Sequence, residues 1–149
     1  MPNLQSIWIK RAKGGPMDPA SQARLVAGRG IVGNADQGGR RQVTIISTDG
    51  WTHVTSPLGE VPDPIVRRAN LLVTGLDLAD SRNKVLQIGA VRIRILNETR
   101  PCEQMDAARP GLRGAMSVPW GGGAYGEVLD DGEIAIGDPV AFIGGPALA

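Results

Sequence analysis

Glycine and proline punctuate this sequence so densely that they limit what it can fold into. The 21 glycines and 11 prolines make up about a fifth of the 149 residues. Proline interrupts a helix interior, and glycine there costs about 0.5–1 kcal/mol relative to alanine. Long helices are therefore disfavoured, and the spacing favours many short strands joined by turns. With 42% apolar residues, the chain is expected to fold as one globular domain over residues 1–149.

The expected strands are marked by alternation of apolar and polar residues between these breaks. The alternation is strictest at 91–95, where the apolar residues take one face and Arg92 and Arg94 face solvent. This segment is expected to pair with 84–88 through a turn at Gly89-Ala90. The other strands are predicted at 4–11, 24–27, 41–46, 71–73 and 140–143.

A second hairpin is predicted near the C-terminus. Asp130-Asp131-Gly132 is typical of a type I′ turn, so residues 127–129 and 133–136 are expected to pair. Residues 120–126 are expected to form a flexible loop. Short helices are predicted at 48–54, 103–109 and 112–116. Seven or more short strands with a few short helices indicate a mainly β fold, and a closed barrel would leave no strand edge exposed.

Cys102 is the only cysteine, which excludes an internal disulfide and a zinc site of cysteine type. The single histidine, His53, lies among Thr and Ser, which argues against a Ser-His-Asp triad. A lone cysteine is usually a small buried hydrophobe. The alternative is a reactive thiol, because Arg100 and a helix beginning at Pro101 would favour the thiolate. The residues by themselves leave both alternatives open.

The charge of the chain argues against binding to nucleic acid. The net charge is +1 and aromatic residues make up only 3%, so neither a basic surface nor a stacking platform is expected. All basic residues except Lys10, Lys13 and Lys84 are arginines, which suit a bound anion, although a coding bias explains the excess equally well. No apolar run reaches the roughly 18–20 residues of a membrane span. The N-terminus lacks signal-peptide features, so a cytoplasmic location is expected.

Residues 28–41 hold five glycines, three of which have the G-x-G-x-x-G spacing of dinucleotide-binding loops. That interpretation fails because a strand follows, whereas the dinucleotide motif opens a long helix. A hydride-transfer enzyme is therefore excluded. Two alternatives remain: a loop that holds an anion through backbone N–H groups with Arg40 and Arg41, or a tight turn between strands.

Four segments in order resemble the MOSC domain, a module named for its place at the C-terminus of molybdenum cofactor sulfurases. Residues 30–34 are similar to the Gly-hydrophobic-x-Gly-Asp turn of that family, and 41–46 to the strand that follows it. Residues 68–78 are similar to its Asn-Leu…Gly-hydrophobic-Asp-Leu segment, and 89–102 to the strand that ends in Pro-Cys. The resemblance extends from about residue 7 to residue 140. It departs at Asn34, where Asp is common, and at Ala35-Asp36, where many members have His.

The resemblance implies a MOSC-type β-barrel and one of two uses for Cys102. In one, the thiol carries sulfur as a persulfide from a cysteine desulfurase, which holds the pyridoxal phosphate, to an acceptor such as the molybdenum cofactor or its enzyme. In the other, the thiolate is a ligand of molybdenum in a bound pterin cofactor, and N-hydroxylated compounds are reduced. Carrier and enzyme both need an accessible, deprotonated thiol, so the sequence does not separate them.

The resemblance also suggests which residues hold the cofactor. Arg100 would stabilise the thiolate, and Asn70 lies in the matching Asn-Leu segment. An anion clamp for the pterin phosphate is expected from Arg40, Arg41, Arg67 and Arg68. The alternative of a different class is a non-catalytic β-barrel that binds a small anion or a protein partner.

Overall fold

The computed structural model describes residues 2–100 and 103–143, which form a mainly β structure with a few short helices. The helical elements are α1 (Thr48–Thr55), the 3-10 turns η1 (Ser56–Leu58) and η2 (Pro64–Arg67), α2 (Glu103–Ala108) and α3 (Leu112–Met116). The strands are β1 (Asn3–Lys10), β2 (Met17–Ala20), β3 (Gln22–Val26), β4 (Gly30–Ile31), β5 (Val43–Ser47), β6 (Leu71–Thr74), β7 (Val85–Ile88), β8 (Val91–Glu98), β9 (Ala124–Val128), β10 (Gly132–Ala135) and β11 (Val140–Ile143). Each predicted helix is present within a few residues, as is each strand predicted outside the second hairpin.

The strands form two open sheets, so the predicted closed barrel is not confirmed. The large sheet has the order β11-β7-β8-β9-β5-β6-β1-β2, and the small sheet has the order β10-β3-β4. The start of β1 does meet the residues before β11, since the Leu4 N–H donates to the Asp138 carbonyl. The Val140 N–H also donates to the Pro2 carbonyl, and the Gly137 N–H donates to the Leu4 carbonyl. The two segments are joined by one bridge, between Asn3 and Pro139, and are not paired as strands of one sheet.

The hairpin predicted around Asp130-Asp131-Gly132 is wrong. β9 pairs with β5 and β8 in the large sheet, whereas β10 pairs with β3 in the small sheet. The two aspartates bind elsewhere: Asp130 accepts hydrogen bonds from the backbone and guanidinium of Arg92, and Asp131 Oδ1 accepts one from the Ala27 N–H. These hydrogen bonds fix the segment that passes from β9 in the large sheet to β10 in the small sheet. The predicted flexible loop at 120–126 is also too long, because β9 begins at Ala124.

The hairpin of β7 and β8 is confirmed, with Ile88 opposite Val91 across the Gly89-Ala90 turn. Arg92 and Arg94 are exposed, as the alternation predicts. β5 and β6 are the one parallel pair among the described strands, and α1 lies in the connection between them. No helix within residues 2–100 and 103–143 is long and apolar enough to span a membrane.

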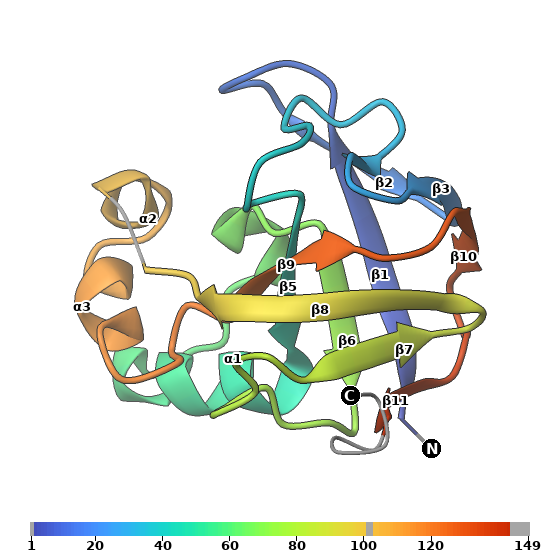
Figure 1. Ribbon diagram of the computed structural model, residues 1–149. Helices are drawn as coiled ribbons and strands as arrows, with labels where there is room; N and C mark the ends of the chain where they lie inside the picture. The colour runs from blue at the N-terminus through green and yellow to red at the C-terminus, as the bar shows by residue number, and fades with distance from the viewer. Residues whose placement is uncertain (1, 101–102, 144–149) are drawn as a thin grey trace.

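The main core joins both sheets in one apolar cluster, which includes Leu25 and Ile134 from the small sheet and Ile45 and Ile93 from the large sheet. A separate cluster fills the space among the helices, with Trp51, Val54, Met105, Leu112 and Met116. Figure 1 shows α2 and α3 on the side of the molecule where β8 ends. The helices therefore border the end of β8, the strand that leads into the Pro-Cys pair.

Candidate functional site

Pro101 and Cys102, the centre of the predicted site, lie outside the described residues. The described chain reaches Thr99 and Arg100 directly after β8 and resumes in α2 at Glu103. The geometry of the site is therefore built from the described residues around the end of β8.

A buried arginine holds this end of β8 in place. The Arg67 side chain is 9% exposed, and its Nε donates to the Gly122 carbonyl at 2.9 Å while its Nη2 donates to the Thr99 hydroxyl. The Thr99 hydroxyl in turn donates to the same Gly122 carbonyl. A buried cation is tolerated only when its N–H groups are hydrogen-bonded. Arg67 thus ties the end of η2, the end of β8 and the segment before β9 together.

A cleft of about 410 Å³ opens next to this clamp, lined by Glu98, Arg100, Arg113 and residues 116–119. We call it the arginine cleft. Glu98 Oε1 accepts a hydrogen bond from the Trp120 N–H at 3.0 Å, which directs this carboxylate to the backbone. Two guanidinium groups against one carboxylate give the cleft a net positive charge that suits an anion. Arg100 is one of the residues predicted from the sequence, whereas Arg113 is not, because only the position of α3 brings it to the same cleft.

The four arginines predicted to form an anion clamp have different described contacts. Arg67 is buried against Thr99 and Gly122. Arg68 has a positive φ of 62°, and its guanidinium donates to the Gly15 carbonyl between β1 and β2.

The other two arginines precede β5. The guanidinium of Arg41 lies over the ring of Tyr125, 5.2 Å from its centroid, and Arg40 is exposed. Of the predicted residues, Arg67 and Arg100 lie at the end of β8. Arg41 contacts Tyr125, which pairs with Asn97 of β8, whereas Arg68 contacts the segment between β1 and β2.

Asn70 is a structural centre of the fold. It is 5% exposed, and both N–H groups of its amide are used within the protein, one by the Trp8 carbonyl and one by Asn34 Oδ1, each at 3.1 Å. Its Oδ1 accepts from the Thr44 N–H, and Asn34 Oδ1 also accepts from the Lys10 N–H. The pair joins β1, β5 and the glycine segment. Asn70 therefore holds these three parts of the fold together, and both N–H groups of its amide are already bonded within the protein.

Several hydrogen bonds join residues within the glycine-rich segment 28–41. Its centre forms β4, which pairs with β3, and the Gly38 N–H donates to the Arg29 carbonyl. The Gln37 amide donates to the carbonyls of Ile31 and Asn34. These contacts are those of a turn between strands. Among the described residues, no group of three or more His, Cys, Asp or Glu is placed to hold a metal ion.

Comparison with known families identifies the module. The model of the family described as MOSC domain matches residues 29–141. The chain belongs to the MOSC domain family. The match confirms the resemblance that the sequence motifs indicated. It extends from β4 to β10 and therefore includes the end of β8. No curated protein matches this MOSC chain.

Solved structures share the fold of this MOSC domain. The YuaD protein of Bacillus subtilis has 20% sequence identity and a TM-score of 0.78, with 94% of each chain covered. YiiM of Geobacillus stearothermophilus has 15% identity and a TM-score of 0.73, covering 97% of this chain and 76% of that one. YiiM of Escherichia coli has 14% identity and a TM-score of 0.71, covering 97% of this chain and 71% of that one. At these identities the likeness establishes the fold alone.

Proposed function

We propose that this MOSC protein acts in molybdenum-cofactor and sulfur metabolism, with Cys102 as its reactive group. Membership of the family supports the cofactor class. The observation that carries the proposal is the arginine cleft, because Arg100 and Arg113 offer two cations beside the residues that precede the Pro-Cys pair. A cationic neighbourhood lowers the pKa of a thiol and makes its thiolate available. A reducing compartment such as the cytoplasm would keep this lone thiol free.

In the carrier role, the Cys102 thiolate attacks the outer sulfur of a persulfide on a cysteine desulfurase. A new S–S bond forms on Cys102 as the old one breaks, and the cysteine of the partner leaves as a thiolate. Pyridoxal phosphate stays with the desulfurase. The acceptor is the molybdenum cofactor or an enzyme that contains it.

In the ligand role, Cys102 binds the metal of a molybdenum-pterin cofactor, since soft thiolates suit such metals. The cofactor would supply the redox chemistry that reduces an N-hydroxylated compound. Arg100 and Arg113 would hold its phosphate through charge-assisted hydrogen bonds. The anionic phosphate and the net positive charge of the cleft fit one another.

Both roles predict that Cys102→Ser abolishes activity and leaves the fold intact. The purified protein should be analysed for molybdenum, and its intact mass should be measured for one added sulfur atom. Molybdenum supports the ligand role, and persulfide without metal supports the carrier role. Cys102→Ser should show neither molybdenum nor added sulfur. Ser117→Ala, which changes the lining of the arginine cleft, should keep whichever of the two signals the wild-type protein shows. Full activity of Cys102→Ser would contradict the proposal.

A second candidate is a non-catalytic module that binds an anion, since the charge of the arginine cleft does not require a thiol. The rate of Cys102 alkylation against pH separates the two. A thiol with the ordinary pKa of about 8.5 favours the binding module, and a lower value favours the reactive cysteine.

A further inference from the structure

Three neighbouring strands of the large sheet bring basic residues together at one end. β5 runs parallel to β6, and β1 runs antiparallel to β6, with Ile45 and Ile7 both opposite Leu71. The starts of β5 and β6 therefore lie beside the end of β1. The basic residues at these three places, which we call the basic end, are Lys10, Arg11 and Lys13 of β1 and the loop after it, Arg40 and Arg41 before β5, and Arg68 before β6.

Contacts between the loops hold the basic end together as one surface. The Ala35 N–H donates to the Lys10 carbonyl at 2.6 Å. The guanidinium of Arg68 donates to the Gly15 carbonyl in the loop between β1 and β2. Figure 1 shows this loop and the segment that leads to β5 at the top of the molecule, away from α1. The cations of the basic end therefore face one partner from several loops.

The basic end has more cations than its own carboxylates neutralise. Its two carboxylates are already paired, Asp36 with Lys10 at 2.9 Å and Asp18 with Arg11 at 3.5 Å. No ion pair with a described carboxylate is formed by the other four cations, which are Lys13, Arg40, Arg41 and Arg68. Such an excess of one charge attracts groups of the opposite charge.

A shallow apolar depression adjoins the basic end. It measures about 630 Å³ and includes Val26 and Val32, and the Val32 side chain is 52% exposed. Gly33 also lines it, and a Cβ atom on Gly33 would overlap with the guanidinium of Arg11. Arg11 therefore lies against the segment that forms this depression. An apolar contact and several cations are thus available to the same partner.

We propose that the basic end binds an acidic segment of a partner protein, with an apolar side chain of that segment against Val32. The unpaired cations lie on three separate parts of the chain, which fits an extended acidic segment better than a small anion. Residues 10–18 and 33–41 contain no aromatic side chain on which a nucleic-acid base would stack. The proposal does not depend on the role of Cys102.

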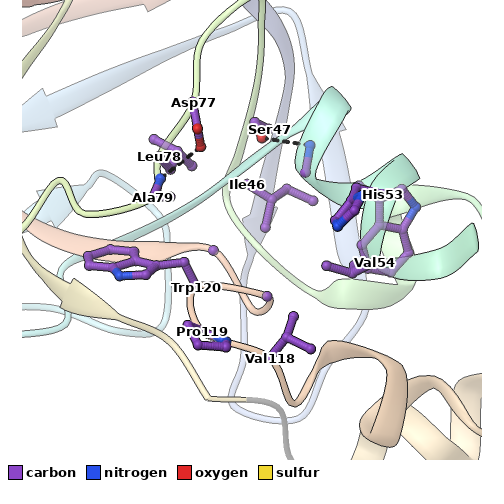
Figure 2. Close-up of a pocket in the computed structure, with 14 residues that line it drawn as sticks. Ile46, Ser47, His53, Val54, Asp77, Leu78, Ala79, Val118, Pro119 and Trp120 are labelled. Carbon is purple, nitrogen blue, oxygen red and sulfur yellow. Dashed lines mark hydrogen bonds between the residues drawn. The ribbon is translucent and has the colours of Figure 1, made fainter.

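The basic end is distinct from the cavities around the end of β8. None of its residues is in the described lining of the arginine cleft. None is in the described lining of the pocket between α1 and Trp120, which Figure 2 shows. The location of a bound probe therefore separates this proposal from binding at those cavities.

Short peptides test the charge and the apolar contact. The main probe is a run of glutamates with one central leucine, and two matched peptides replace the leucine by serine or the glutamates by lysines. Each is titrated into the ¹⁵N-labelled full chain, and backbone amide shifts are followed. We expect the leucine peptide to bind with shifts centred on residues 10–16, 29–41 and 68, and its affinity to fall with added salt.

The matched peptides supply the contrast. The serine peptide should bind roughly fivefold more weakly, because it lacks the apolar contact, and the lysine peptide should not bind. Equal binding of the lysine peptide, no binding of either glutamate peptide, or shifts centred on the arginine cleft or the pocket of Figure 2 would overturn the proposal. Equal affinity of the leucine and serine peptides would overturn the contact with Val32.

Two other polyanions test the class of partner. Oligothymidylate with the same number of charges and vesicles containing phosphatidylserine are titrated under the same conditions. Both should bind more weakly than the leucine peptide, because neither matches the acidic groups together with an apolar side chain. Tighter binding of the oligonucleotide or of the vesicles would overturn the choice of a protein partner.

Variants locate the two contacts. Lys13→Glu reverses an unpaired charge, and the affinity of the leucine peptide should fall roughly tenfold. Lys84→Glu is the matched control, since Lys84 is also exposed but precedes β7. An equal loss in both variants would show that net charge alone governs binding and would overturn the proposal. The amide spectrum of each variant without peptide reports whether the fold is kept.

Val32→Ser tests the apolar contact by a double-mutant cycle. In this variant the leucine and serine peptides should bind with nearly equal affinity, because the group that distinguishes them has lost its partner. If the fivefold difference between the two peptides persists in Val32→Ser, the leucine does not lie against Val32 and this part of the proposal is overturned.

Discussion

Arg67 shows how a single buried side chain shapes the surroundings of the candidate site. Its guanidinium reaches two groups at once, the Thr99 hydroxyl and the Gly122 carbonyl. These partners lie 32 and 55 residues away along the chain. Arginine suits this position because its planar fork directs several N–H groups in fixed directions, whereas lysine offers one compact charge. The residue predicted as an anion ligand is thus bound to the protein itself at these atoms.

Replacing Arg67 should therefore affect stability more strongly than replacing an exposed arginine. Arg67→Lys keeps the charge but cannot make both directed bonds, and we expect the free energy of unfolding to fall by about 2–4 kcal/mol. Urea denaturation followed by circular dichroism measures it. The matched control is Arg40→Lys at an exposed position, expected to change stability by less than about 0.5 kcal/mol. Equal midpoints for the two variants would show that the Arg67 bonds contribute little.

At the level of elements, the segment between α3 and β9 packs closely against two other parts of the chain, the end of β8 and β5. A Cβ atom on Gly122 would overlap with the carbonyl oxygen of Thr99. A Cβ atom on Gly123 would overlap with that of Ile45. Glycine is needed here because backbone approaches backbone too closely for any side chain. The predicted flexible loop is thus a tightly fitted connection.

Gly122→Ala should push the end of β8 away and loosen the Arg67 clamp. We expect a loss of about 1–3 kcal/mol, the usual cost of forcing extra atoms into a filled space. Gly114→Ala is the matched control, because Gly114 lies in α3 and a Cβ atom added there would point into open space. Alanine should stabilise α3 there by up to about 1 kcal/mol. Thermal unfolding of both variants tests the contrast, and a Gly122→Ala protein as stable as Gly114→Ala would rule out the close approach.

At the scale of the whole molecule, two sheets must be held together, and charged side chains at the surface contribute to this. Asp130 links β8 of the large sheet to the turn that leads into β10 of the small one. The hydrogen bond from Arg92 holds the pKa of the Asp130 carboxyl below its ordinary value of 3.8. A carboxyl with a lowered pKa in the folded state stabilises the fold above its unfolded pKa, and this contribution is lost as the pH falls.

Asp130→Asn should therefore lower the urea midpoint near neutral pH, modestly, because the pair is exposed. The difference in urea midpoint between the two proteins should shrink as the pH falls below 3.8, because the wild-type Asp130 carboxyl becomes protonated and loses its charge. Asp80→Asn provides the control at an exposed aspartate outside this pair. A gap between wild type and Asp130→Asn that is independent of pH would contradict the assignment to the Arg92 ion pair.

Much of the local structure is predictable from the sequence. The alternation at 91–95, the turn at Gly89-Ala90 and the short helices depend on neighbours within a few residues, and all are present. The Asp130-Asp131-Gly132 turn failed because its aspartates bind Arg92 and Ala27, far away in the chain. For the site, the motifs identified the family and Arg100, but not the partners of Arg67 and Asn70.

The sequence by itself determined the short strands, the few helices and the membership of the MOSC family, because spacing and local motifs are written along the chain. The tertiary structure alone decided which sheet each strand joined, and that β1 and the segment before β11 meet in one bridge. It also placed Arg113 beside Arg100 in one cleft. The physical reason is that such contacts join residues far apart in sequence, and their hydrogen bonds and charges exist only once the chain has folded.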